Sequence, residues 1–328
     1  MDRRPLSDRF GRQVVDLRVS VTDRCNFRCR YCMPEEGLVW APRSEILTFD
    51  EIERVVTVMV DCFGVTSVRL TGGEPTLRPH LPSLVARLAR LPVELSMTTN
   101  GSTLSHLARP LKEAGLHRVT VSIDSLRPER FAAIARRDML PAVLAGFHAA
   151  RAAGLPVKVN TVLMRDFNDD EVLDLADFGR RTGAEVRFIE FMPLDGAGEW
   201  SGRKVVPAAE ILEQVGSVYP LEPVGGRGAQ PAERYRYLDG AGTLGVVASV
   251  TRPFCSTCDR ARLTADGQFR SCLFAVRERD LRSMLRSGAS DSELAAAIEQ
   301  EVAEKWAGHA IGQVTFIRPA RSMSQIGG

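Results

Sequence analysis

The sequence predicts an α/β protein that begins as an open, partial (β/α)6 barrel of the TIM-like kind and continues into a C-terminal region of different character. Three observations predict this fold. Short β-branched runs alternate with longer helical stretches over the first 195 residues, which is typical of a parallel sheet. Glycine follows several of the helical stretches, as at many helix ends. Polar residues recur where the strand-like runs end, which is where a barrel holds its ligands.

Six strands are expected in the first part, at residues 17–22, 67–71, 93–98, 118–122, 157–162 and 185–191. Helices are expected between them at 49–62, 81–90, 104–114, 141–153 and 169–181. The polar strand ends are residues 22–23, 71–74, 98–100, 122–124 and 190–192. A ligand site is therefore expected at the carboxyl edge of the sheet.

The pattern changes after residue 195, so we expect a first domain at 1–195 and a C-terminal region at 196–328. Paired strands are expected at 235–238 and 246–250, and mostly helix in the last sixty residues. Residues 240–245 match G-x-G-x-x-G, but a dinucleotide fingerprint must follow a strand and open a helix. This copy lies between two strand-like runs, so it is interpreted as a hairpin turn.

Size and composition exclude several classes of protein. The 328 residues are 44% hydrophobic and 26% charged, as expected for a globular protein with a sizeable core. The net charge of +2 creates no field that would draw the chain to nucleic acid. No apolar stretch follows the charged N-terminus, and no run approaches the roughly 18 apolar residues of a membrane span. We therefore expect a cytoplasmic protein, in which clustered cysteines indicate metal binding or catalysis.

Cys25, Cys29 and Cys32 form a C-x3-C-x2-C group directly after the first expected strand. Three thiolates leave one iron of a 4Fe–4S cluster open, and an open iron can bind a small molecule. A structural zinc site would need a fourth ligand nearby, and none of the five histidines lies in this loop. We interpret the group as an iron–sulfur site, whereas Cys62, on the apolar face of an expected helix, is assigned to the core.

A second group, Cys255, Cys258 and Cys272, has the spacing C-x2-C-x13-C. Asp266 and Gly267 predict a hairpin that returns Cys272 to the other two cysteines. Spacing alone leaves zinc and iron–sulfur equally open for this group.

Arg260 and Arg262 follow Cys258 two positions apart, so an extended strand would place both side chains on one side. Arginine forks suit bidentate recognition of phosphate, although solvated arginines are the alternative in an arginine-rich chain. The chain has only four lysines, at 112, 158, 204 and 305, which draws attention to Lys158 at the start of an expected strand.

Together these motifs resemble the radical S-adenosylmethionine (SAM) superfamily, through the first cysteine group, Tyr31 before its third cysteine, and Gly-Gly-Glu-Pro at 72–75. Within that superfamily the chain is similar to the GTP 3′,8-cyclases of molybdenum cofactor biosynthesis. The matching segments run in order through nearly the whole chain, at 17–34, 69–79, 98–101, 121–126, 158–162, 187–194, 255–274 and 327–328. The second cysteine group with its arginines and the terminal Gly-Gly are the most discriminating.

The resemblance implies two 4Fe–4S clusters, one on each cysteine group, with SAM as a further cofactor. It implies that a 5′-deoxyadenosyl radical removes the ribose C3′ hydrogen of GTP and that the product is (8S)-3′,8-cyclo-7,8-dihydro-GTP. The open iron of the second cluster is expected to take the guanine base. The protein itself must hold both substrates and exclude competing hydrogen donors.

The resemblance also implies the contact residues by motif position. SAM contacts are expected at Tyr31, Gly73, Ser122 and Met192. GTP contacts are expected at Arg18, Arg69, Thr98, Lys158, Arg187, Arg260, Ala261 and Arg262. The catalytic set is Cys25, Cys29, Cys32, Arg260, Arg262, Gly327 and Gly328.

Gly327 and Gly328 would ordinarily be a frayed chain end. The resemblance instead implies a tail that enters the active site, where only glycine has the required size and backbone freedom. Deleting both residues is expected to spare the clusters and SAM binding and to abolish cyclisation.

Two alternatives stay open. Another radical SAM enzyme with an auxiliary cluster, such as a peptide-modifying maturase, generally has more cysteines in its C-terminal part. A zinc-binding structural or nucleic-acid-binding module predicts a colourless protein, and the near-neutral charge counts against it. The expected partners are GTP, SAM, an unidentified electron donor and a second copy of the chain, with no nucleic acid and no membrane.

Overall fold

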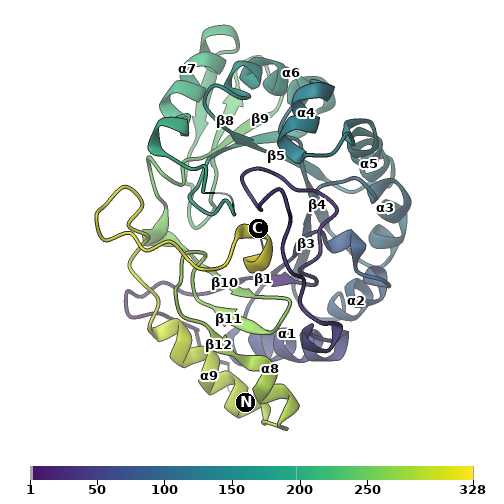
Figure 1. The fold of residues 1–328 in the computed structure, drawn as a ribbon, viewed down its shortest axis with the longest axis vertical. Helices are drawn as coiled ribbons and strands as arrows, with labels where there is room; N and C mark the ends of the chain where they lie inside the picture. Colours follow the sequence, from purple (N-terminus) through teal and green to yellow (C-terminus); the bar gives the residue numbers. More distant parts are fainter. Residues whose placement is uncertain (1–2, 197, 328) are drawn as a thin grey trace.

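The computed structural model describes residues 3–196 and 198–327 of the chain. One sheet of twelve strands runs in the order β12-β11-β10-β1-β2-β3-β4-β5-β6-β9-β8-β7. Figure 1 shows this sheet curved into an open ring, with helices around its outside. The expected open, partial barrel is confirmed.

The first part of the chain supplies six parallel strands that pair in chain order. They are β1 (Asp16–Ser20), β2 (Ser67–Thr71), β3 (Glu94–Thr99), β4 (Arg118–Ser122), β5 (Val157–Leu163) and β6 (Glu185–Glu190). The helices are α1 (Phe49–Phe63), α2 (Leu81–Leu88), α3 (Leu104–Glu113), α4 (Pro128–Ala135), α5 (Leu140–Ala152) and α6 (Val172–Thr182). All six strands and five of these helices were expected; α4 was not.

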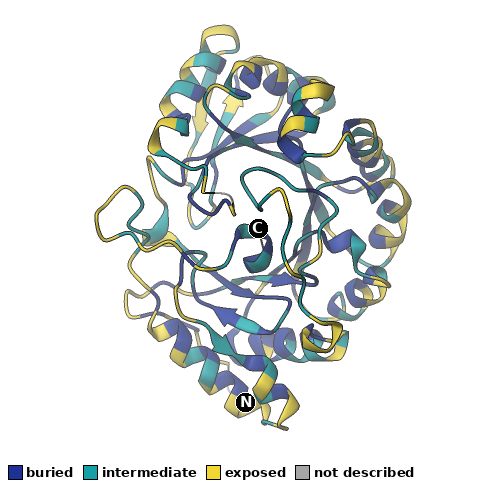
Figure 2. Cartoon of the chain, in the orientation of Figure 1, coloured by how far each residue is buried: buried dark blue, intermediate teal, exposed yellow. Residues whose placement is uncertain are grey.

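Local chemistry explains the helix ends. Thr48 and Glu51 form a capping box at the start of α1, and Gly64 follows its last turn with a φ of +71°. The helix buries Ile52 and Val55 completely, and each such side chain contributes about 1.5–3 kcal/mol to stability. Figure 2 shows the resulting arrangement, with buried residues on the strands and on the helix faces that cover them.

The C-terminal part extends both edges of the same sheet. On one side β10 (Arg260–Leu263) pairs with β1 in parallel, followed by β11 (Gln268–Arg270) and β12 (Arg279–Asp280). On the other side β9 (Thr243–Val247) pairs with β6 in parallel, followed by β8 (Glu233–Tyr237) and β7 (Leu221–Val224). The expected pairing of the strands near 235–238 and 246–250 and the expected hairpin around Asp266 and Gly267 are confirmed.

The expectation of a mostly helical end is wrong. After α7 (Ala208–Val218), which was not expected, the helices are α8 (Leu281–Arg286), α9 (Asp291–Ala303) and the short α10 (Met323–Ile326). Residues 304–322 run without regular structure, because Gly308, Gly312 and Pro319 interrupt any helical pattern. In Figure 1 this segment leads the yellow C-terminal helix into the middle of the ring.

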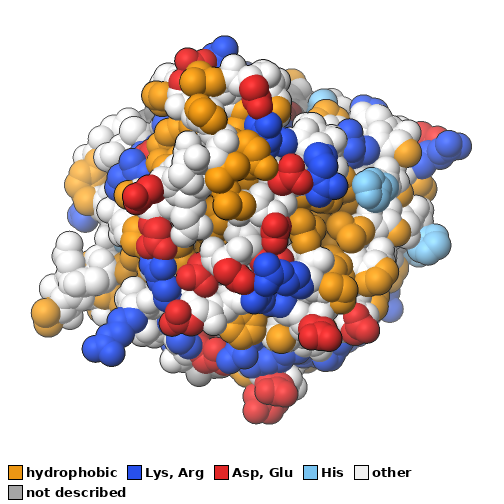
Figure 3. Space-filling view, turned by 90° about the horizontal axis from the view of Figure 1, so that it is seen from above, with side chains coloured by type: hydrophobic (Ala, Val, Ile, Leu, Met, Phe, Trp, Pro, Cys, Tyr) orange, Lys and Arg blue, Asp and Glu red, His pale blue; other side chains and the backbone are white. Residues whose placement is uncertain are grey.

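The outer surface carries charges of both signs. On the face seen in Figure 3, Lys and Arg side chains lie among Asp and Glu side chains and do not gather into one basic patch. No helix in residues 3–196 and 198–327 is long and apolar enough to pass through a membrane.

Candidate active site

A cavity of about 310 Å³ lies at the carboxyl edge of strands β1–β6, where the polar strand ends predicted it. Cysteines of both groups line this cavity: Cys25, Cys29, Cys32, Cys255, Cys258 and Cys272. β10 begins just after Cys258 and pairs in parallel with β1, which ends just before Cys25. The two groups therefore lie beyond opposite ends of this strand pair, and the one cavity reaches both.

Most of the expected contact residues also line the cavity: Tyr31, Gly73, Ser122, Met192, Arg18, Arg69, Thr98, Arg187, Arg260 and Arg262. Lys158 and Ala261 do not line it. Side chains alternate along β10, so Ala261 faces the hydrophobic core while its two neighbours face the ring. Any contact of Ala261 with a ligand would therefore come from its backbone. Gly328 lies outside the described residues.

The first cysteine loop is held by close backbone contact with Gly72 and Gly73. The amide of Gly73 donates to the carbonyl of Thr22 at 2.8 Å, and a Cβ on Gly73 would collide with the carbonyls of Asp23 and Arg24. Only glycine fits there. The amide of Phe27 points at the Cys25 sulfur at 3.4 Å, and such N–H···S contacts are typical of iron–sulfur ligands.

Asp124 was not among the predicted site residues, yet it fixes Tyr31. The Tyr31 hydroxyl donates to Asp124 Oδ2 at 2.7 Å, and the amide of Val162 donates to Oδ1 at 2.8 Å. Burial raises the pKa of Asp124 to about 6. The position of Asp124 at a polar strand end was the signal that could have identified it.

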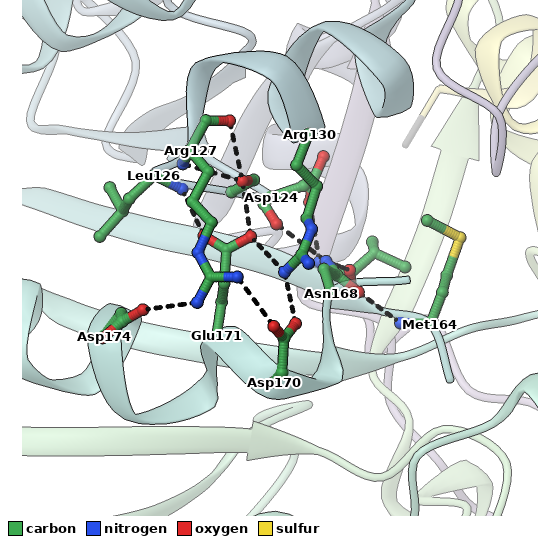
Figure 4. A network of polar contacts seen from close by, with 11 residues as sticks. Asp124, Leu126, Arg127, Arg130, Met164, Asn168, Asp170, Glu171 and Asp174 are labelled. Carbon is green, nitrogen blue, oxygen red and sulfur yellow. Dashed lines mark hydrogen bonds and ion pairs between the residues drawn. The ribbon is translucent and has the colours of Figure 1, made fainter. Parts of the chain in front are cut away.

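Figure 4 shows the network that holds the loop after β4, which contains Asp124. Asn168 donates to the carbonyls of Asp124 and Val162 at 2.8 and 2.9 Å. The fully buried Glu171 accepts from Ser125 Oγ at 2.7 Å and from the amide of Leu126 at 2.9 Å. These contacts make the Asp124 carboxylate a fixed support for the first cysteine loop.

Three arginines lie side by side across neighbouring strands, with Arg18 of β1 opposite both Arg262 and Arg69. None of the three forms an ion pair with another described residue, and the Nε atoms of Arg18 and Arg69 have no hydrogen-bond partner there. Burial, together with the positive charge of the neighbouring Arg18, lowers the pKa of Arg69 to about 9. Buried cations without anions are costly, so this row is suited to an anionic ligand.

Glu185 explains why Lys158 lies off the cavity. Its carboxylate accepts from Lys158 Nζ at 3.2 Å, from Arg187 Nε at 2.7 Å and from Arg234 Nε at 2.7 Å. Burial raises the pKa of a carboxyl, but the charges of these cations outweigh that effect and lower the pKa of Glu185 to about 2. No motif singles out Glu185, so only the fold reveals its role.

The low pKa of Glu185 predicts a pH-dependent contribution to stability. The unfolded carboxyl titrates at about 4.3, so the contribution is fully present above that pH and is lost as the pH falls through about 2. We expect Glu185→Gln to lower the Tm of the metal-free protein at pH 7, and to lower it less at pH 3. Thermal unfolding at both values checks this, with Glu129→Gln on the exposed face of α4 as control. An equal loss of Tm at both pH values would contradict the ion-pair explanation.

The second cysteine group surrounds the start of β10 and the end of β11. The amide of Phe274 points at the Cys272 sulfur at 3.4 Å. Burial opposes ionisation of the Cys258 thiol, but the charges of Arg260 and Lys305 outweigh it and lower its pKa to about 7. The Cys258 thiol is therefore ready to serve as an anionic metal ligand near neutral pH.

The C-terminal tail lies inside the ring. The carbonyl of Gly327 accepts from Arg262 Nη1 at 3.2 Å. Gly327 has a φ of +91°, and a Cβ there would collide with Ser20 Oγ and lie 2.7 Å from Thr71 Oγ1. Ile326 is 1% exposed and packs against Leu194 and Phe274. The tail is thus anchored by an apolar side chain and ends in a position that only glycine fits.

The donor sets fit iron–sulfur clusters. Each group offers three thiols at one cavity and at least one amide directed at a sulfur. In the part of the chain that the structure describes, no three His, Cys, Asp or Glu side chains are arranged to hold a single metal ion. A 4Fe–4S cluster makes a different demand, because each thiolate ligates a different iron.

Comparisons with known proteins agree with this geometry. Residues 19–179 match the Radical SAM superfamily, and residues 184–311 match Molybdenum Cofactor Synthesis C. A GTP 3′,8-cyclase of Streptomyces coelicolor is 51% identical over 328 residues, with 98% of this chain and 96% of the relative covered. A GTP 3′,8-cyclase of Mycolicibacterium smegmatis is 49% identical over 332 residues, with 99% and 92% covered.

A solved structure supports the fold. SuiB of Streptococcus suis, determined bound to S-adenosylmethionine, superimposes with a TM-score of 0.62 at 13% identity. The match covers 87% of this chain and 68% of SuiB. Because the identity is low, the likeness concerns the fold alone.

Proposed function

Because the chain belongs to the GTP 3′,8-cyclase family of radical SAM enzymes, we propose a division of labour between residues 1–195 and residues 196–328. The reaction is the radical cyclisation of GTP to (8S)-3′,8-cyclo-7,8-dihydro-GTP in molybdenum cofactor biosynthesis. The first part would bind SAM and supply arginines for the triphosphate of GTP, and the second would hold the guanine base and complete the triphosphate site. One observation carries the proposal: two cysteine groups face one cavity whose arginine row has no anionic partner among residues 3–196 and 198–327.

The first cysteine group would hold the 4Fe–4S cluster that, when bound, supplies the electron for cleaving SAM to a 5′-deoxyadenosyl radical. The residues around it bind and orient SAM. Gly73 allows close approach, and Ser122 and Met192 offer a hydroxyl and a thioether to the cavity. Asp124 already accepts the Tyr31 hydroxyl, so Tyr31 would contact SAM through its backbone or ring.

The arginine row would bind the triphosphate of GTP. Arg18, Arg69 and Arg262 lie in one row, and their forks can each donate two hydrogen bonds to phosphate oxygens. Arg187 lines the cavity while Glu185 fixes its Nε, so it would present its remaining donors in a defined direction. The second cysteine group would hold a second 4Fe–4S cluster whose open iron takes the guanine base.

Replacing Arg69 with methionine is predicted to weaken GTP binding while raising the thermal stability of the protein. Charge-assisted hydrogen bonds contribute about 1.5–3 kcal/mol, so Arg69→Met should weaken GTP binding by about 10- to 100-fold. The same change removes a partly buried cation that has no ion pair among the described residues, and it should raise the Tm of the metal-free protein. Calorimetric GTP titration and thermal unfolding measure both effects, with exposed Arg109→Met of α3 as control. Unchanged GTP affinity would remove Arg69 from the triphosphate site.

Anaerobic reconstitution tests the proposal as a whole. Roughly eight irons per chain are expected, together with an equal amount of sulfide. Reaction with SAM, a reductant and each nucleoside triphosphate in turn should give the cyclised product with GTP alone. Roughly four irons would contradict the second cluster, and product formation from ATP would contradict the guanine contact.

The remaining partners follow from the same family membership. We propose a homodimer that receives electrons from an external one-electron donor in the cytoplasm, where thiols stay reduced. Sedimentation of the reconstituted protein tests the dimer, and a monomer at micromolar concentration would contradict it.

A further inference from the structure

Lys305 is a buried ammonium with an unusual set of partners. It follows α9, and the whole side chain is 2% exposed. Its Nζ lies 2.9 Å from the carbonyl of Arg260, 3.2 Å from the carbonyl of Cys258 and 3.6 Å from the Cys258 sulfur. Two neutral carbonyls and one thiol sulfur are thus the acceptors around this charge.

Among the described residues no carboxylate forms an ion pair with Lys305, although the Asp259 carboxylate feels its charge. The nearest acidic neighbour in sequence to Cys258, Asp259, forms its ion pair with Arg260 instead, at 3.5 Å. Hydrogen bonds to carbonyls do not repay the desolvation of an ammonium, so a buried lysine needs an anion. The atom in reach that becomes anionic on ligating a metal is the Cys258 sulfur.

Arg12 fixes the chain on both sides of this contact. Its guanidinium donates to the carbonyl of Cys255 at 2.6 Å and to the carbonyl of Ala307 at 2.8 Å, and it pairs with the buried Asp8. The segment that carries Lys305 is therefore tied to the second cysteine group by backbone contacts. These backbone contacts hold Lys305 Nζ close to the Cys258 sulfur. Arg12 supplies them through carbonyl groups and not through a contact with a sulfur.

We propose that Lys305 is a counter-ion of the second cysteine group beside Arg260, where it positions the Cys258 thiolate and raises the reduction potential of the cluster ligated there. The inference rests on the proposed second cluster. A positive charge and an N–H···S hydrogen bond both favour the more negative, reduced form of a cluster. Lys305 acts through Cys258 and is a positioning residue.

Three substitutions separate charge, hydrogen bonding and side-chain shape. Lys305→Met removes both charge and donor, Lys305→Gln keeps a donor, and Lys305→Arg keeps both. Each is made in the full-length chain with Cys25, Cys29 and Cys32 replaced by alanine, so that only the second group can hold iron. Lys112→Met, on the exposed face of α3, is the matched control.

Iron content and EPR-monitored redox titration are the readouts, and neither depends on turnover. Lys305→Met is expected to lower the reduced-to-oxidised ratio at a fixed potential about tenfold, which is about 59 mV for one electron. Lys305→Gln should fall between Met and the parent, and Lys305→Arg should stay near the parent. Loss of iron in Met and Gln with retention in Arg also supports the proposal, because charge then decides whether the thiolate is held.

Two results would overturn it. One is an unchanged iron content and potential in all three variants; the other is loss of iron in Lys305→Arg as well, because shape would then matter more than charge. A parent protein that takes up no iron in its second group would instead remove the second cluster, and with it the role of Lys305. The two failures are therefore distinguishable.

Discussion

Replacing Cys29 with alanine is expected to abolish the formation of 5′-deoxyadenosine from SAM. The change removes one of the three thiolates of the first cysteine group, and two thiolates do not retain an open 4Fe–4S cluster. The loop should keep its shape, because the amides of Cys32 and Met33 donate to the backbone carbonyl of Cys29 at 2.9 and 3.0 Å. Iron content should fall by roughly four per chain while the second group keeps its iron.

Cys62→Ala provides the matched control for this result. Cys62 is a buried residue of α1 and lies outside both cysteine groups. The control should keep full iron content and full SAM cleavage, with a small loss of Tm. Residual SAM cleavage in Cys29→Ala above the level of protein without iron would show that the first group is not the site of radical formation.

Replacing Gly327 with alanine is expected to reduce cyclisation by about 10- to 100-fold. A non-glycine residue at a φ of +91° is strained by about 1–3 kcal/mol, and each 1.4 kcal/mol at the reacting geometry changes the rate tenfold. The added methyl group would also displace Ser20 and Thr71. Iron content and SAM binding should stay unchanged, because the nearest atoms that an added Cβ would meet belong to Ser20 and Thr71 and not to a cysteine. Product formation and SAM affinity, measured on the same preparation, check both parts.

Gly288→Ala is the control that introduces the same backbone strain at a position away from the tail. Gly288 follows α8 with a φ of +82°, and a Cβ there meets nothing within 4 Å. It should cost stability in the same way and leave cyclisation intact. A Gly327→Ala protein that cyclises GTP as fast as the Gly288→Ala protein would exclude a role for the tail in the reaction.

The sequence predicted the barrel elements well because their signals are local. Strands such as β4 alternate Val119 and Val121 toward the helices with Thr120 and Ser122 toward the ring, and that alternation is visible in the sequence. Helix α4 was missed because it is short and starts directly after an Arg-Pro turn. The expectation of mostly helix in the last sixty residues was wrong, because glycines and a proline after α9 override the surrounding helix formers.

The composition of the site was also predictable, but its geometry was not. Spacing and motifs pointed to the six cysteines and to most of the other residues that line the cavity. Their contacts with SAM and GTP stay predictions. Spacing and motifs did not reveal that Lys158 and Arg187 are bound by Glu185, or that Asp124 holds Tyr31. These partners carry no motif, because a carboxylate acquires such a role only from what the fold places beside it.

By itself the sequence determined which chemistry is available: thiolates in two groups of three, a surplus of arginine near the second group, and a glycine end. Only the tertiary structure decided how these meet. The pairing of β10 with β1 joins residues more than two hundred positions apart, and it sets both cysteine groups at one cavity with Arg18, Arg69 and Arg262 in a single row. Lys305 likewise reaches Cys258, 47 positions away in the chain, only through tertiary packing. Such contacts depend on strand pairing and burial between distant segments, and the distance between those segments along the chain carries no signal.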